Sequence, residues 1–191
     1  MLFCKICEIK MKKCCFCLLP MLLLASCKPA IRKESRTVFA LGTVCNIQLF
    51  TEMPQTEIES VLQTCTARLQ ELDRHLSANA ESSTLIDINK ASGVSAVTVP
   101  ANIYPLFERA LFFAQKTDGA FNPVIVSVVK LWNIGFENAA KPDDAAITKE
   151  LRNTNYRDME LYGNTVFMKK KGMKLDLGAI AKGFAADELT R

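Results

Sequence analysis

The sequence predicts a fold that mixes strands with helices, and three patterns support this prediction. An apolar alternation on either side of Gly42 is typical of a strand pair or one bent strand. From residue 54 to about residue 76, apolar side chains recur at three- and four-residue spacing, as on the buried face of a helix. Residues 159–162 and 165–168 then predict the two strands of a hairpin.

Shorter elements are expected between and after these three. Residues 85–89 predict a short helix, and residues 103–117 predict an amphipathic helix that stops at Asp118-Gly119. Residues 173–177 predict a further strand, and the segment that begins at Gly178 predicts a last helix. Because the sequence stops inside that helix, we expect the chain to be the first part of a longer domain.

Length and composition indicate one modest folded domain. The chain has 191 residues, of which 49% are apolar and 23% are charged, a balance that is too apolar for disorder. Six of its eight cysteines lie in the first 27 residues, at Cys4, Cys7, Cys14, Cys15, Cys17 and Cys27. A disulfide-stapled domain would spread its cysteines through the fold, so the sequence excludes that class.

The positive net charge is concentrated at the beginning of the chain. Residues 1–26 hold four lysines and Glu8; removing them from the totals of 24 basic and 20 acidic side chains leaves 20 and 19. Proteins that bind nucleic acid usually carry a concentrated basic face. The near-neutral remainder gives no reason to expect nucleic acid as a partner.

The first 27 residues have the order of a secretory leader. After Met11 come two lysines, an uncharged stretch from Cys14 to Cys27, and small residues at its end. Fourteen uncharged residues are too few to cross a bilayer core, which takes about 20. Leu24-Ala25-Ser26-Cys27 resembles a bacterial lipobox, whose cysteine is diacylated after cleavage.

We therefore expect residues 1–26 to be a signal peptide, with Met11 as an alternative start, and residues 27–36 to be a lipidated tether. Several acyl chains on Cys27 would hold the protein stably at a bilayer. The expected location is the bacterial cell membrane, with the folded part facing the periplasm.

Candidate chemistry is concentrated near the end of the chain. His75 is the only histidine, which excludes a multi-histidine metal site based on this chain, and we expect it to be a partly exposed residue at the end of its helix. Asp176 precedes Gly178, and Lys182 follows within the first turn of the expected helix. A helix N-terminus beside a lysine suits phosphate, although the residues alone favour an ordinary strand-to-helix turn.

Four stretches together give a more specific indication. A-L-G-T, L-D-R-H-L-S-A-N-A-E-S-S, T-D-G-A-F-N-P…L-W-N-I-G-F and L-D-L-G-A-I-A-K-G-F-A-A-D occur in this order. Residues 37–191, which contain them, resemble the ApbE family of FAD:protein FMN transferases. The resemblance implies an α+β fold, here the N-terminal portion only of an FAD-binding domain. It also implies Mg²⁺ as cofactor, FAD as substrate and a target flavoprotein as partner.

Members of that family cut the pyrophosphate of FAD and attach FMN to a threonine or serine of the target; some hydrolyse FAD instead. By motif position, the resemblance implies that the backbone oxygen of Ala179 binds Mg²⁺. It assigns no catalytic residue. The residues that it implies for FAD binding are Leu41, Asn79, Ala120, Phe121, Asn122, Asp176 and Lys182.

Two departures from the family pattern leave the activity open. Asn79 stands where many members have an aromatic residue that covers the nucleotide, which shifts the balance among binding, hydrolysis and transfer. Members also continue well beyond the equivalent of Arg191, through Asp and Ser/Thr side chains that complete the Mg²⁺ site. The alternative to a transferase is therefore an inactive, membrane-anchored remnant or a weak flavin-binding lipoprotein.

Overall fold

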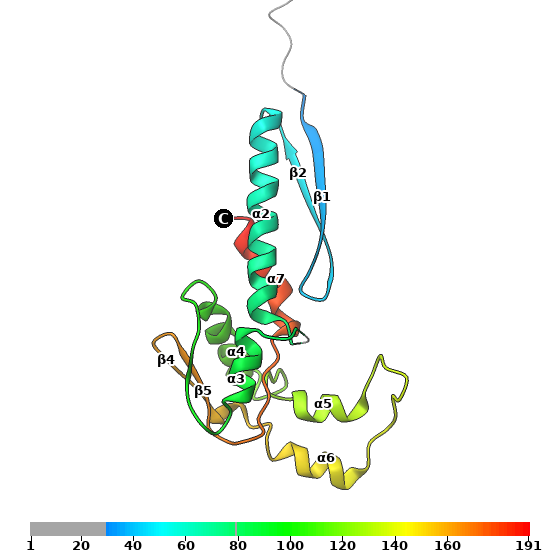
Figure 1. Cartoon of the computed structure of the whole chain (residues 1–191), viewed down its shortest axis with the longest axis vertical. Coiled ribbons are helices and arrows are strands. Elements are labelled where there is room, and N and C mark those ends of the chain that lie inside the picture. The colour runs from blue at the N-terminus through cyan, green and yellow to red at the C-terminus, as the bar shows by residue number, and fades with distance from the viewer. Residues whose placement is uncertain (1–29, 79) are drawn as a thin grey trace, which may run out of the picture.

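A computed structural model describes residues 30–78 and 80–191 of the chain (Figure 1). The expected signal peptide, the lipidated Cys27 and the expected FAD ligand Asn79 lie outside the described residues. Within the part that the structure describes, no helix is long and apolar enough to cross a membrane.

The chain first forms an antiparallel hairpin of β1 (Arg32–Ala40) and β2 (Thr43–Thr51), with Ala40 paired to Thr43. Leu41 and Gly42 make the connecting turn with φ angles of 54° and 67°, the positive values that a tight two-residue hairpin turn requires. The predicted strand pair is confirmed. Residues 32–36, expected to belong to the tether, are part of β1, because all five pair with β2.

Helix α2 (Gln55–Leu76) runs alongside this hairpin and carries the predicted apolar stripe (Figure 1). Six of its side chains are buried: Ile58, Leu62, Cys65, Leu69, Leu72 and Leu76. Val61, which the spacing also placed on this face, is only half-buried. The helix begins directly after Pro54, as expected from the fixed φ of proline.

A second group of elements surrounds the C-terminal end of α2. It comprises α3 (Thr84–Lys90), β3 (Val97–Thr98), α4 (Tyr104–Lys116), β4 (Met159–Tyr162) and β5 (Thr165–Met168). The short strands form a sheet in the order β3-β5-β4, antiparallel throughout. One apolar core includes Leu72 of α2, Ile88 of α3, Phe107 of α4 and Met168 of β5. The predicted helices 85–89 and 103–117 and the hairpin are confirmed.

Between α4 and β4 the chain extends to one side as a lobe (Figure 1). The lobe contains α5 (Val126–Trp132) and α6 (Asp144–Leu151), which pack against each other. The 3-10 turn Tyr156–Asp158 then leads back into β4. Helix α6 was not predicted, and the structure gives the physical reason: none of its residues is buried, so it has no apolar stripe to recognise.

The strand expected at residues 173–177 is wrong. The segment is extended, and Met173, Leu175 and Leu177 alternate into the core, but its backbone does not join a ladder among the described strands. Its hydrogen bonds go elsewhere. The Leu175 N–H donates to Asn89 Oδ1 at 2.6 Å, and Asn89 Nδ2 donates to the Leu175 carbonyl at 3.0 Å. A side chain of α3 thus replaces a neighbouring strand.

The last helix, α7 (Gly178–Leu189), follows this segment, as the sequence predicts. Its buried residues, Ala181 and Ala185, belong to the same core as Leu69 and Leu72 of α2. Because both are small, α7 lies close beside α2, as Figure 1 shows. Helix α7 also packs against α4.

We predict that Asn89→Ala lowers the free energy of unfolding by about 1–3 kcal/mol, because it leaves the Leu175 N–H and carbonyl without partners in a part-buried position. Urea denaturation followed by circular dichroism measures this loss. Asn46→Ala, on the exposed face of β2, is the matched control and should change stability by less than about 0.5 kcal/mol. Equal effects of the two substitutions would show that the hydrogen bonds between Asn89 and Leu175 do not stabilise the fold.

Candidate active site

Three distant parts of the chain enclose one small cavity, which we call the turn cavity. The β1–β2 turn, the C-terminal end of α2 and the first turns of α7 form its walls, and its volume is about 150 Å³. Its lining consists of Leu41, Gly42, Asp73, Leu76, Ser77, Ala78, Asp176, Gly178, Ala181 and Lys182. Cofactor pockets commonly measure about 300–1,000 Å³, so the turn cavity has room for only part of a dinucleotide.

The wall formed by the β1–β2 turn depends on a hydrogen bond to α2. Leu41 N–H donates to Asp73 Oδ1 at 2.8 Å. Leu41 has a left-handed backbone conformation, which costs a non-glycine residue about 1–2 kcal/mol. A hydrogen bond to a charged acceptor contributes about 1.5–3 kcal/mol, so this bond offsets the strain of the turn.

Asp176 forms the opposite wall. Its neighbours Leu175 and Leu177 are buried, and the alternation of an extended segment directs Asp176 away from the core. Its backbone N–H donates to the Pro123 carbonyl at 2.9 Å. Its Oδ1 accepts from the Gly178 N–H at 2.6 Å, which satisfies one of the free donors at the start of α7.

Lys182 supplies the positive charge of the turn cavity. It lies one helical turn after Gly178, with its Nζ 3.4 Å from the Gly178 carbonyl, and its side chain is exposed. The N-terminus of α7 adds its partial positive charge nearby. An ammonium group and a helix N-terminus on one wall can bind a phosphate group.

The structure therefore brings together Leu41, Asp176 and Lys182 from the predicted ligands. Ala120, Phe121 and Asn122 follow α4 and do not line the turn cavity. The Asn122 side chain instead holds loops together, donating to the Thr154 carbonyl at 2.8 Å and accepting from the Val124 N–H at 3.0 Å. The next residue, Pro123, contacts the cavity wall through its carbonyl, which accepts the Asp176 N–H.

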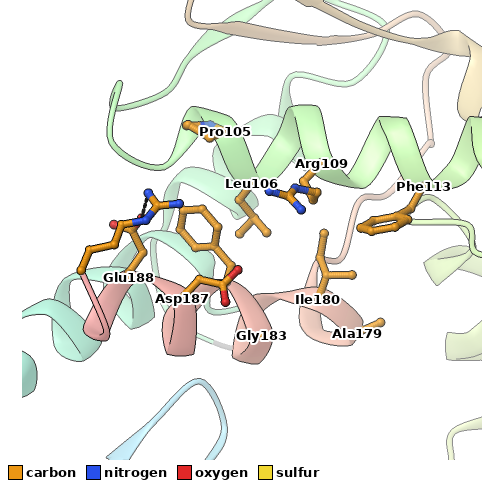
Figure 2. A pocket seen from close by; sticks show the side chains of 11 residues that line it. Pro105, Leu106, Arg109, Phe113, Ala179, Ile180, Gly183, Asp187 and Glu188 are labelled. Atoms are coloured by element: carbon orange, nitrogen blue, oxygen red, sulfur yellow. Dashed lines mark hydrogen bonds and ion pairs between the residues drawn. The ribbon is translucent and has the colours of Figure 1, made fainter.

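Ala179 lies on a different face of α7. It lines a groove between α4 and α7, the helix groove, with a volume of about 380 Å³. Figure 2 shows Arg109 and Phe113 of α4 facing Ile180 and Ala179 of α7 across this groove. The predicted metal ligand and the predicted phosphate ligand Lys182 thus line separate hollows on the two sides of one helix.

The described residues do not on their own fit a Mg²⁺ site. Among residues 30–78 and 80–191, no group of three or more His, Cys, Asp or Glu side chains could hold a metal ion. The turn cavity offers two carboxylates, Asp73 and Asp176. Mg²⁺ takes six oxygens in near-octahedral order, usually one or two carboxylates together with waters and substrate phosphates, so these two side chains would need other ligands to complete a site.

A network of charged side chains holds the C-terminal end of α7 against α2. Arg68 of α2 donates to Glu188 of α7 at 2.7 Å and to Glu71 at 2.9 Å. Asn102 Nδ2 donates to the other Glu71 oxygen at 2.7 Å. The hydrogen bonds from Asn102 and Arg68 hold the pKa of Glu71 below its ordinary value.

Sequence reasoning assigned no role to Asp73 or Ala78, although both line the turn cavity. Asp73 was present in the L-D-R-H-L-S stretch, but a carboxylate on a helix is usually a solvated residue. His75, expected at the partly exposed end of the helix, is half-buried in the last turn of α2, and its Nδ1 lies 2.8 Å from Thr84 Oγ1.

Comparison with known sequences identifies the family. A sequence model described as the ApbE family matches residues 41–191. An FAD:protein FMN transferase of Treponema pallidum (strain Nichols) is 40% identical over 168 residues, which cover 84% of this chain and 46% of that protein. Another, of Klebsiella pneumoniae (strain 342), is 41% identical over 116 residues, covering 60% and 37%. The chain belongs to the ApbE family.

Solved structures agree with this assignment. The ApbE protein of Thermotoga maritima matches with a TM-score of 0.74 at 28% identity, over 83% of this chain and 51% of that one. The flavin transferase ApbE of Vibrio cholerae matches in fold with a TM-score of 0.73 at 22% identity, over 84% and 52%. The predicted α+β fold is confirmed, and the chain spans about half the length of these relatives.

We predict that the Glu71 carboxylate stabilises the fold above the ordinary glutamate pKa of about 4.3 and that this stabilisation is lost as the pH falls through its lowered pKa. The sign follows because the folded state holds the proton less tightly than the unfolded state. Unfolding free energies measured from pH 6 to pH 3 should fall less steeply in Glu71→Gln than in the wild type.

Asn102→Ala provides an independent check, since it removes the first contributor to this lowered pKa and leaves the Glu71 carboxylate in place. It should also flatten the acid limb of the stability curve. An unchanged limb in both variants would show that the network contributes nothing to acid stability.

Proposed function

We propose that this chain functions as an FAD:protein FMN transferase, which moves FMN from FAD to a threonine or serine of a target flavoprotein. One observation carries the proposal: Leu41 of one family motif and Asp176 and Lys182 of another line a single cavity at the N-terminus of α7. The relatives of Treponema pallidum and Klebsiella pneumoniae that bear this name support it.

In this proposal the pyrophosphate of FAD lies at the first turn of α7. Lys182 and the free N–H groups of the helix would stabilise the negative charge that develops as the phosphoanhydride bond breaks. Asp176 would keep the first turn in place through its bond to Gly178. Leu41, partly buried against the core, would pack beside the nucleotide.

Mg²⁺ remains part of the proposal because the resemblance implies it, with the Ala179 carbonyl as one ligand, although Ala179 lines the helix groove rather than the turn cavity. When bound, Mg²⁺ would neutralise charge on the pyrophosphate. We assign no step to it, since the described residues hold no group of three side chains that could bind a metal ion. FAD pyrophosphatase activity belongs to the same proposal, with water in place of the acceptor hydroxyl.

A second candidate is a flavin-binding lipoprotein without turnover. The small volume of the turn cavity, about 150 Å³, supports weak binding of this kind. The two candidates share the binding site and differ in the products formed, so one set of measurements separates them.

We predict that the purified chain binds FAD and that Lys182→Ala weakens binding about tenfold or more, because a charge-assisted contact to phosphate is lost. Titration of flavin fluorescence measures affinity. Lys174→Ala is the matched control, since Lys174 is also exposed but does not line the cavity. Equal affinities in all three proteins would remove Lys182 from the site.

The same samples, supplied with Mg²⁺ and an acceptor protein, distinguish the two candidates. Intact-mass analysis of the acceptor detects attached FMN, and chromatography detects free FMN and AMP. Attached FMN supports the transferase, whereas saturable binding without either product supports the flavin-binding lipoprotein. No binding contradicts both.

We also propose that the protein is anchored by acylated Cys27 at the bacterial cell membrane, facing the periplasm. The support is the order of the leader: lysines, a short uncharged stretch, small residues and then cysteine. The expected tether is short, because β1 begins at Arg32.

We predict that mass spectrometry of the membrane fraction of expressing bacteria finds an N-terminal peptide that begins at acylated Cys27. Cys27→Ser should abolish acylation and leave the leader uncleaved. Cys17→Ser changes another leader cysteine and should leave the acylated product unchanged. An unmodified Cys27 in a mature, membrane-bound protein would refute the anchor.

A further inference from the structure

Asp73 occupies a position that its own helix does not favour. It lies near the C-terminal end of α2, and its backbone carbonyl accepts the N–H of the C-cap residue Ser77. The carbonyl groups at this end carry partial negative charge, so a carboxylate there is unfavourable to the helix. The reason for an aspartate at this position must lie in a contact outside α2.

That contact is the Leu41 N–H, 2.8 Å from Asp73 Oδ1. In the described part of the chain, three residues other than glycine have positive φ: Leu41, Asp118 and Asn133. Asp and Asn support this conformation with their own short polar side chains. Leucine cannot, and Asp73 supplies the missing acceptor from a neighbouring element.

The turn that Asp73 holds is one wall of the turn cavity. Leu41 and Gly42 face Asp176 and Lys182 across it, and Asp73 itself lies in the lining. Figure 1 shows the turn at the end of the hairpin, near the C-terminal end of α2 and the N-terminal end of α7. Within the described residues this hairpin forms a sheet of two strands, so the turn relies on its contacts with α2 for its place.

We propose that Asp73 is a positioning residue for FAD binding and that it acts through its hydrogen bond to Leu41 rather than through its charge. The proposal rests on the FAD-binding function proposed above. This role differs from that of a metal ligand or a general base, for which the carboxylate charge would be essential.

Two substitutions distinguish acceptor from charge. Asp73→Asn keeps a carbonyl oxygen that accepts the Leu41 N–H and removes the charge, whereas Asp73→Ala removes both. We expect Asp73→Ala to weaken FAD binding about tenfold or more and Asp73→Asn to stay within about threefold of the wild type, as loss and retention of one hydrogen bond predict. Glu57→Ala, at an exposed carboxylate in the first turn of α2, is the control and should bind as the wild type.

Hydrogen exchange of the Leu41 amide, measured by NMR without FAD, gives a readout that does not depend on flavin. The amide should be protected in the wild type and Asp73→Asn and should exchange at least about tenfold faster in Asp73→Ala. If the wild type fails to bind FAD, the proposed function fails, and exchange still decides whether Asp73 holds the turn.

Two results would overturn the proposal. The first is an Asp73→Asn variant that retains a protected Leu41 amide and yet loses FAD binding, which would show that the charge acts directly. The second is an Asp73→Ala variant that binds FAD as tightly as the wild type. If Asp73→Ala does not fold, Asp73→Asn decides alone: wild-type affinity supports positioning, and lost affinity refutes it.

Discussion

The packing of α7 against α2 is the contact on which the site depends. The turn cavity forms where the first turns of α7 lie beside the end of α2 and the β1–β2 turn. Ala181 and Ala185 make this approach close because they carry no bulk beyond a methyl group. Arg68 then ties the far end of α7 to α2 through Glu188, in a mostly buried ion pair. Lys182 and Asp176 would not face Leu41 without this arrangement.

The parts of the fold that the sequence predicts correctly are those with local periodicity. The stripe of α2 and the hairpin at residues 159–168 each repeat a pattern over several turns or strands, and both formed as expected. Residues 173–177 have such a pattern and yet do not pair as a strand with the described strands. Their alternating burial is that of a strand, but their backbone partner is the side chain of Asn89, which is distant in sequence and has no periodic signature.

The residues of the candidate site also fall into those that a local sequence pattern indicates and those that it does not. Asp176 and Lys182 could be connected from the sequence because both belong to one short segment around a helix N-terminus. Leu41 required the family resemblance, since a leucine before a glycine carries no chemical signal of its own. Asp73 was missed because its partner is a backbone N–H, a group that every residue except proline offers. Such contacts become visible only in three dimensions.

Asn89 and Asp73 perform the same task at opposite walls of the site. Each is a helical side chain that binds the backbone of another segment: the extended segment at Leu175 in one case and the β1–β2 turn at Leu41 in the other. Neither wall therefore relies on a further strand for its position. Walls fixed before a ligand arrives lose little conformational freedom on binding, which preserves affinity. The extended segment carrying Asp176 and the turn carrying Leu41 can thus present a preformed surface to a nucleotide, even though both are short connections rather than parts of a large sheet.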